Sequence, residues 1–313
     1  MELNQSLPRV LVIVGPTASG KSALALEIAR RIPSEIISAD SRQVYKFLTI
    51  GTAKPSGEEL TRVKHHFVDA LMPDQHFNAG EFGTLARETA AQVLERRKLP
   101  VIVGGTGLYV RSLLDGLFSG PGREEDIREK LESRLESEGA AVLLEELRDV
   151  DPEAAKRMLP SNQRRIIRAL EVYYTTGKPI SVHHEEQKAR EYFDSIMVAL
   201  EWKREALYHR INSRVDAMLA AGFLDEVKQI VSLGYDDRYK SLQTVGYKEA
   251  IAFLRSEISY DRMVELMKQN TRRFAKRQLT WFRRDRRIRW FPIAEEREIS
   301  EVALDVLRLI GEK

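Results

Sequence analysis

Short apolar runs alternate with amphipathic segments through the first part of the chain, up to about residue 115. Apolar runs of strand length predict β-strands at Val10–Val14, Glu35–Ala39 and Val101–Val103. Apolar residues at helical spacing predict helices over residues 20–32, 80–98 and 107–115. Strands that alternate with helices are typical of a parallel sheet, so we expect an α/β core here.

The pattern changes at Ser119-Gly120-Pro121-Gly122. From residue 124 to about 177 the chain has helical periodicity and many charges, and Phe193–Leu200 then has the composition of another sheet strand. Residues 203–285 again read as mostly helical. We therefore expect three segments: residues 1–118, the first part of the core; 119–192, a helical insertion domain; and 193–313, a return to the core with a helical, basic C-terminal part.

A glycine-rich segment, Gly15-Pro16-Thr17-Ala18-Ser19-Gly20-Lys21-Ser22, joins the first predicted strand to the first predicted helix. This spacing between a strand and a helix is that of a phosphate-binding loop, or P-loop, as in nucleotide-binding and ATP-binding proteins. The glycines let backbone N–H groups face one anion, and the helix N-terminus adds its positive end. Lys21 can reach terminal phosphate oxygens, and Ser22 can ligate Mg²⁺. The sequence thus predicts a P-loop NTPase-like sheet that binds a diphosphate or triphosphate.

Two other strand ends should face the same crevice, because ligands gather at the carboxyl ends of strands in an open α/β sheet. Asp40 follows the second strand, where it can serve as a general base or orient an acceptor. A helix N-cap or an outer-shell Mg²⁺ partner are its structural alternatives. After the third strand, Gly104-Gly105-Thr106-Gly107 suits close approach of the backbone to a ligand, with Thr106 donating a hydrogen bond and Arg111 neutralising phosphate. A tight strand-to-helix turn would also explain these glycines.

Two basic segments favour a polyanionic partner. Arg164 and Arg168 share one face of a predicted helix, although such arginines commonly pair with surface acids. Residues 271–290 carry nine Lys or Arg against one acid, Asp285. Four aromatic side chains interleave with these cations: Phe274, Trp281, Phe282 and Trp290. Because cations and aromatic rings together suit phosphate contacts and base stacking, we expect nucleic acid to bind here rather than a merely solvated face.

Composition excludes several classes of protein. With no cysteine, the chain has no disulfide, thiolate metal site or thiol nucleophile. The adjacent pairs His65-His66 and His183-His184 lack the spacing of metal ligands. No window approaches the ~20 apolar residues of a membrane span, and the N-terminus lacks a signal-peptide pattern. We expect a cytoplasmic protein that does not contact a membrane.

An ordered series of motifs runs along the chain. It comprises Gly-Pro-Thr-Ala-Ser-Gly-Lys-Ser at 15–22, Ser-Ala-Asp-Ser-Arg-Gln-Val-Tyr at 38–45, Ile-Gly-Thr-Ala-Lys-Pro at 50–55, Val-Gly-Gly-Thr-Gly-Leu-Tyr at 103–109, Arg-Ile-Ile-Arg-Ala-Leu-Glu-Val at 165–172, Val-Gly-Tyr-Lys-Glu at 245–249 and Thr-Arg-Arg-Phe-Ala-Lys-Arg-Gln-Leu-Thr-Trp-Phe-Arg at 271–283. A P-loop alone is unspecific, but this series resembles the tRNA dimethylallyltransferase (tRNA isopentenyltransferase) family over nearly the whole chain.

The resemblance implies transfer of a dimethylallyl group from dimethylallyl diphosphate to the exocyclic amine of the adenosine immediately 3′ of the anticodon in tRNA. Asp40 would accept the proton of this weakly nucleophilic amine. The P-loop, Lys21, Arg111 and a Mg²⁺ cofactor held by Ser22 would stabilise the departing diphosphate, and Thr106 would help to hold the reacting groups. The base must be flipped into the crevice, since it cannot be reached while stacked.

The resemblance also implies a set of residues that grip the flipped base or hold the RNA: Asp40, Ser41, Arg42, Gln43, Thr106, Arg128, Gln163, Arg164, Arg165, Ile166, Ile167, Gln243, Gly246, Tyr247, Lys248, Lys276, Arg277, Gln278 and Arg283. We expect the insertion to contact the anticodon stem and the protein to act as a monomer. The alternatives are an adenylate isopentenyltransferase acting on a free nucleotide, a P-loop kinase or ATPase, and a purely RNA-binding module. The insertion and the basic C-terminal segment favour tRNA over a small acceptor.

Overall fold

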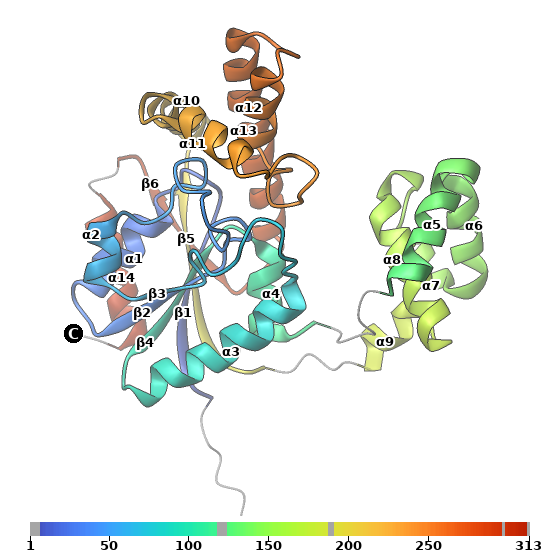
Figure 1. Cartoon of the computed structure of the whole chain (residues 1–313). Helices are drawn as coiled ribbons and strands as arrows, with labels where there is room; N and C mark the ends of the chain where they lie inside the picture. Colours follow the sequence, from blue (N-terminus) through green and yellow to red (C-terminus); the bar gives the residue numbers. More distant parts are fainter. Residues whose placement is uncertain (1–6, 118–123, 187–190, 296–297, 312–313) are drawn as a thin grey trace, which may run out of the picture. The chain divides into compact units, whose positions relative to one another are not determined.

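The computed structural model describes residues 7–117, 124–186, 191–295 and 298–311. The chain divides into two compact units, residues 1–114 with 191–313 and residues 115–190. Figure 1 shows an α/β arrangement in the first unit and only helices in the described part of the second. The insertion expected from sequence, 119–192, differs from the second unit by a few residues at each end.

A six-stranded parallel sheet forms the centre of the first unit, in the order β3-β2-β4-β1-β5-β6. Its strands are β1 Arg9–Val14, β2 Ser34–Ser38, β3 His65–His66, β4 Leu99–Gly104, β5 Asp194–Trp202 and β6 Ile288–Ile293. The predicted α/β class is confirmed, and the predicted strands correspond to β1, β2, β4 and β5. The apolar pattern misses β3 and β6, the two edge strands.

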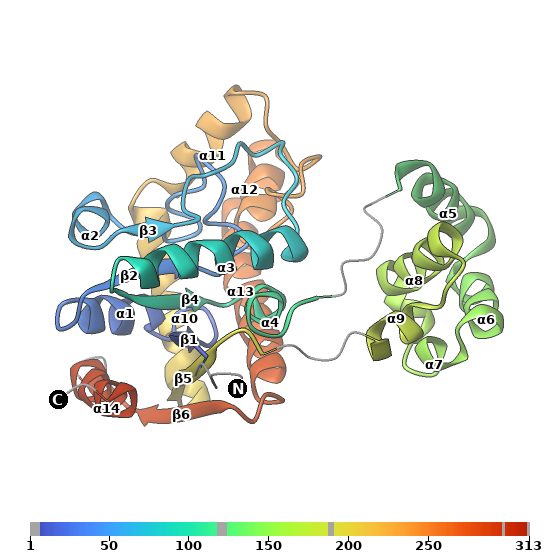
Figure 2. The same ribbon diagram turned by 90° about the horizontal axis from the view of Figure 1, so that it is seen from below.

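Helices cover both faces of this sheet. They are α1 Lys21–Ala29 and α14 Ile299–Ile310 on one face, and α3 Ala79–Glu95 and α4 Gly107–Asp115 on the other. Because successive side chains of a strand point to opposite faces, Leu11 and Ile13 of β1 pack with the first pair, while Val10 and Val12 pack with the second. Figure 2 shows α1 and α14 on the left of the sheet and α4 on its right.

A second apolar core in the same unit joins the loop after β2 to the C-terminal helices. These helices are α10 Arg204–Ala220, α11 Phe223–Ser232, α12 Tyr247–Leu254 and α13 Tyr260–Phe282, and the short α2 Gly57–Arg62 follows the loop. Val44 and Leu48 of the loop are buried with Phe223, Tyr247 and Met267 of the helices. The loop is therefore fixed to helices that lie far from it in sequence.

The second unit is a helical bundle with its own core. Its helices are α5 Glu125–Glu138, α6 Ala140–Val150, α7 Pro152–Ala155, the 3₁₀ turn Pro160–Asn162, α8 Gln163–Thr176 and α9 Ile180–Glu186. Leu131, Leu143 and Leu170 lie in its interior. The buried Asp151 accepts hydrogen bonds from the N–H groups of Ala154 and Ser181, both at 2.9 Å, so one carboxylate joins the starts of α7 and α9.

Candidate active site

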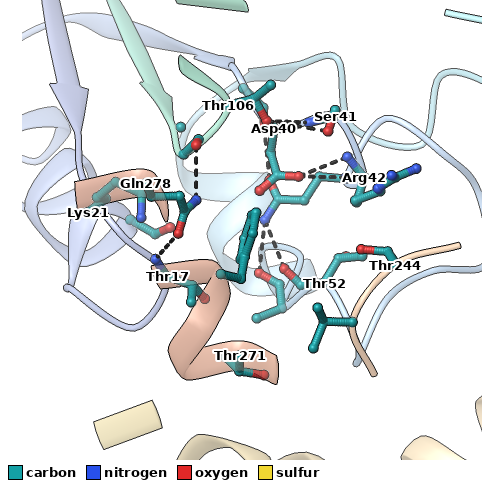
Figure 3. A pocket seen from close by; sticks show the side chains of 18 of the residues that line it. Thr17, Lys21, Asp40, Ser41, Arg42, Thr52, Thr106, Thr244, Thr271 and Gln278 are labelled. Atoms are coloured by element: carbon teal, nitrogen blue, oxygen red, sulfur yellow. Dashed lines mark hydrogen bonds between the residues drawn. The ribbon is translucent and has the colours of Figure 1, made fainter. Parts of the chain in front are cut away.

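A pocket of about 430 Å³ lies in the first unit, at the carboxyl ends of β1, β2 and β4. The loops that follow these strands contribute Lys21, Asp40 and Thr106 to its wall. Helices α10 and α13 close it with side chains that include Arg214 and Gln278. Figure 3 shows these loops and helices around one cavity. The structure therefore brings the P-loop, Asp40 and Thr106 together, as expected for strand ends of an open sheet.

The P-loop has the backbone that its glycines permit. Gly15 and Gly20 have φ values of 140° and 93°, in the region that favours glycine. Lys21 Nζ donates a hydrogen bond to the carbonyl oxygen of Pro16 at 2.6 Å. Burial, with a further contribution from nearby Arg214, lowers the pKa of Lys21 to about 7, although the charge of Asp40 opposes the shift. An anionic ligand in this loop would compensate for the burial of the ammonium group.

Side chains from distant elements hold the P-loop from outside. Trp202 Nε1 donates to Ser19 O at 2.8 Å, and Arg210 Nε donates to Ala18 O at 2.9 Å. Gln278 of α13 is buried, and its amide links two loops: Oε1 accepts from Thr17 N, and Nε2 donates to Gly105 O, both at 2.9 Å. Gln278 also lines the pocket, so its contact with tRNA stays a prediction beside this structural role.

Asp40 is held by one carboxylate oxygen and presents the other to the pocket. Oδ1 accepts from Arg42 N at 2.8 Å and from Gln43 N at 3.4 Å, which fixes the turn after β2. Thr106 Oγ1 accepts from Ser41 N at 3.1 Å and supports the same turn. Within the described residues, no protein donor reaches Oδ2, and Figure 3 shows the carboxylate directed into the cavity. Oδ1 therefore makes cap-type bonds to the turn, while Oδ2 is available as a proton acceptor.

Arg42 and Gln43, expected to grip the base, also hold the pocket walls. Arg42 Nη1 donates to Lys240 O at 2.7 Å, and burial lowers the pKa of its guanidinium. Gln43 Oε1 accepts from Ser38 Oγ at 2.9 Å, and its Nε2 donates to Thr52 O and Ala53 O. Both side chains line the pocket; the Gln43 amide is engaged with the protein at both ends, and Arg42 is engaged through Nη1.

Arg214 is a pocket cation that the sequence interpretation missed. It lies on α10 between the buried residues Ile211 and Val215, which also line the pocket. Burial lowers the pKa of Arg214, and the charge of Asp40 opposes this shift. A cation inside the apolar stripe of an amphipathic helix is the signal that could have identified it.

The structure contradicts one prediction about the segment after β4. Arg111 is exposed on α4 and does not line the pocket, since its helix buries Val110 and Leu113 instead. The glycines Gly104, Gly105 and Gly107 line the pocket and also make room for protein neighbours. A Cβ would overlap Ala39 at Gly104, the amide of Gln278 at Gly105, and the indole of Trp281 at Gly107.

The structure divides the expected RNA contacts into exposed and internal groups. The exposed ones are Gln163, Arg164, Arg165, Gln243, Lys248, Lys276, Arg277 and Arg283. Ile166 and Ile167 are corrected, because they are buried in the core of the second unit. Tyr247 is fully buried, and its hydroxyl donates to Glu226 at 2.7 Å. Gly246 is also buried but lines the pocket.

Other residues of the basic segments form ion pairs or pack against the protein. Arg128 binds Glu132 at 2.9 Å and Glu171 at 3.5 Å. Arg283 pairs with Glu201 at 3.3 Å. Of the interleaved aromatic residues, Phe274 and Trp281 are exposed, whereas Phe282 is buried and Trp290 packs partly against the core from β6.

Glu226 of α11 is a second residue that sequence reasoning missed. Its carboxylate accepts from the N–H groups of Thr49, Ile50 and Gly51 at 3.1, 2.6 and 3.2 Å, besides the Tyr247 hydroxyl. One side chain therefore fixes a loop of the pocket wall. Its role depends on hydrogen bonds to a loop that is distant in the sequence, which no local motif indicates.

The pocket offers few ligands for a metal ion. Among the residues that the structure describes, no group of three or more His, Cys, Asp or Glu side chains could hold a metal ion. Ser22, the last residue of the P-loop, is exposed and lines the pocket. A hydroxyl that supplements phosphate and water oxygens fits the coordination of Mg²⁺.

No described helix is long and apolar enough to cross a membrane.

Comparison with known proteins gives consistent results. The model of the family described as IPP transferase matches residues 43–285. The tRNA dimethylallyltransferase 1 of Trichlorobacter lovleyi is 49% identical over 289 residues, covering 92% of this chain and 95% of that protein. The tRNA dimethylallyltransferase of Acetivibrio thermocellus is 46% identical over 286 residues, 91% of each chain.

Solved structures are similar over the same extent. A full-length tRNA isopentenylpyrophosphate transferase from Bacillus halodurans superposes with a TM-score of 0.71 at 37% identity, covering 97% of both chains. A eukaryotic dimethylallyltransferase acting on tRNA gives a TM-score of 0.80 at 28% identity, covering 98% of this chain and 80% of the other.

Proposed function

Because the chain belongs to the IPP transferase family, we propose that it transfers a dimethylallyl group from dimethylallyl diphosphate to the exocyclic amine of the adenosine immediately 3′ of the anticodon in tRNA. The observation that carries this proposal is the placement of Lys21 of the P-loop and Asp40 in one pocket. A diphosphate site and a proton acceptor are the two functions that such a transfer needs.

The P-loop supports the donor. The backbone N–H groups of residues 15–22, Lys21 and Arg214 provide positive potential where the diphosphate carries charge. Charge grows on this group as its oxygen separates from C1 of the dimethylallyl chain, so these cations favour the transition state. Ser22 would hold Mg²⁺ together with diphosphate oxygens, and the ion when bound supplies additional charge neutralisation. Arg111 has no part in this step.

Asp40 supports the acceptor. The amine nitrogen forms a bond to C1 as the C1–O bond breaks, and its proton moves to the free oxygen, Oδ2, of Asp40. Arg42 N and Thr106 hold the turn that carries the carboxylate, so the base is preorganised. Apolar residues of α10 and α13, such as Ile211 and Met267, line the same pocket and suit the dimethylallyl chain.

Exposed cations support tRNA rather than a free nucleotide as acceptor. Lys276 and Arg277 project from α13, and Arg277 lies over the ring of Phe274 at 5.7 Å. Arg164 and Arg165 are exposed on α8 of the second unit. We propose that this unit binds the anticodon stem. These groups suit an RNA backbone and an unstacked loop and would have no use with a small acceptor. We further propose a cytoplasmic monomer that does not contact a membrane.

The test is mass analysis of tRNA nucleosides after incubation of the protein with dimethylallyl diphosphate, Mg²⁺ and unmodified tRNA. We expect a prenylated adenosine at the position 3′ of the anticodon. Parallel reactions with AMP as acceptor distinguish the free-nucleotide alternative. Phosphorylation of any acceptor from ATP, without prenyl transfer, would contradict the proposal and favour a kinase.

A further inference from the structure

The loop between β2 and α2 carries a strained, exposed aromatic residue. Phe47 has a φ of 70°, a backbone conformation that is unfavourable for a bulky side chain and natural for glycine. Its neighbour Leu48 is fully buried, yet Phe47 itself is 36% exposed and belongs to no apolar core of the first unit. Packing therefore does not explain why a phenylalanine occupies this position. Such strain at an exposed position points to a functional role for the side chain.

The position of Phe47 connects it with the pocket. Asp40–Gln43 and Gly51–Ala53, on either side of it in the loop, both line the pocket. Both views place this blue loop beside α11, to which Glu226 binds it. Phe47 thus belongs to a turn whose two arms form the pocket wall.

Phe47 is one of three aromatic residues that contact each other beside Arg42. Its ring lies 6.3 Å from that of Tyr235, and the Tyr235 ring lies 5.6 Å from that of Tyr239. The segment that carries the two tyrosines is bonded to the pocket, because Arg42 donates to Lys240 O. The exposed Lys46 lies next to Phe47 and makes no ion pair within the described residues. Aromatic rings next to a free cation are the combination that binds single-stranded nucleic acid.

We propose that Phe47, backed by Tyr235 and Tyr239, stacks on an unpaired RNA base next to the acceptor adenosine. This inference rests on the proposed function. Flipping the adenosine into the pocket leaves its neighbours without a stacking partner on one side, and an exposed ring on the loop that borders the pocket would replace that partner. The strain at Phe47 is retained because glycine, which the backbone favours, has no ring.

Two substitutions of Phe47 test the proposal, one of which should have opposite effects on stability and on RNA binding. Phe47→Gly should raise the melting temperature, because it relieves the strain, and should weaken binding of an anticodon stem-loop about 10-fold, in the range of one lost stacking contact. Phe47→Trp should keep the affinity. Ser256→Gly is the matched control: Ser256 is exposed with a φ of 62° after α12, so its change should raise the melting temperature without affecting RNA binding.

Modified RNA identifies the contact. Two stem-loops are compared, each with an abasic nucleotide on one side of the acceptor adenosine. One of them should bind the wild-type protein about as weakly as intact RNA binds Phe47→Gly, and with that RNA Phe47→Gly should cause no further loss. Additive losses with both abasic RNAs, unchanged affinity of Phe47→Gly, or a lowered melting temperature for it would each overturn the proposal. The proposed function is tested separately, since it fails only if the wild-type protein does not prenylate RNA.

Discussion

The donor side of the pocket and the exposed face of α13 hold their polar groups in different ways. On the donor side, Lys21 Nζ and the carbonyl groups of Ala18 and Ser19 all have bonded partners within the protein. On α13, Lys276 and Arg277 are exposed and make no ion pair in the described part of the chain, and Arg277 also lines the pocket. Preorganised groups serve chemistry, whereas dispersed cations share the binding of a polyanion. Single substitutions should therefore have large effects in the pocket and small, salt-dependent ones on α13.

The largest effect is expected at Asp40. Asp40→Asn keeps an oxygen that can accept from Arg42 N, so the turn after β2 should remain, but the proton acceptor is lost. We expect kcat to fall ~10²–10⁴-fold with tRNA affinity nearly unchanged. Single-turnover measurements with saturating tRNA would check this. Turnover within threefold of the wild-type value would exclude Asp40 as the base.

Substitutions of two arginines compare a residue inside the pocket, Arg214, with an exposed residue outside it, Arg111. Arg214→Ala removes a charged partner of the diphosphate worth roughly 1.5–3 kcal/mol, so kcat/KM for dimethylallyl diphosphate should fall about 10- to 100-fold. Arg111→Ala serves as the matched control and should change it less than twofold, because Arg111 is exposed outside the pocket. The opposite ranking would restore the assignment expected from sequence.

The pH dependence of donor binding should follow Lys21. Because its pKa is about 7 in the free protein, Lys21 loses its charge as the pH rises above 7, and the KM for dimethylallyl diphosphate should increase by at most ~10-fold per pH unit. Lys21→Arg, which stays charged, should abolish this increase. A KM that is flat from pH 6 to 9 in the wild-type protein would contradict the assignment.

The same pKa has a consequence for stability. Between pH 7 and the ordinary lysine pKa of 10.5, the unfolded chain binds a proton at Lys21 that the folded protein has lost. The unfolded state thus binds more protons, and the contribution of Lys21 makes the free energy of unfolding rise with pH in this window. Urea denaturation of the wild-type and Lys21→Arg proteins across the window would measure the difference.

The smallest effects are expected on α13. Lys276→Ala and Arg277→Ala should each raise the KM for tRNA a few-fold and make the slope of log affinity against log salt less negative by about 0.7 per lost phosphate contact. The KM for the donor should not change. Arg308→Ala on α14, which removes an exposed arginine paired with Asp305, is the control. Slopes identical to that of the wild-type protein would show that the α13 cations are only solvated.

Local patterns were sufficient for the four inner strands of the sheet and for the two loops that hold Lys21 and Asp40, because each depends on residues adjacent in sequence. They were insufficient where a role depends on a distant partner. Glu226 acts through the N–H groups of a loop after β2, and Gln278 through two loops of the core. The prediction that Arg111 binds phosphate was wrong for the same reason, since the packing of α4 decides which face of the helix meets the pocket.

Strand β6 shows a further limit. Its charged, aromatic sequence, Ile288–Ile293, lies within and beyond the basic segment and indicates a surface, yet it forms an edge strand beside β5. An edge strand needs only one neighbour and tolerates exposed side chains, so its apolar pattern is weak.

The predictions of RNA contacts at Arg128 and at residues 163–165 remain predictions.

The insertion between α4 and β5 also bears on how the chain folds. Arg9 of β1 pairs with Asp194 of β5, so the centre of the sheet closes only after residues 115–190 have been synthesised. A flexible segment of that length would impose a loop-closure entropy that increases with its length. The insertion has its own core and mainly local helical contacts, which favour rapid, independent folding. By becoming compact first, it would shorten the effective tether between β4 and β5, so variants that unfold the insertion should slow the assembly of the sheet.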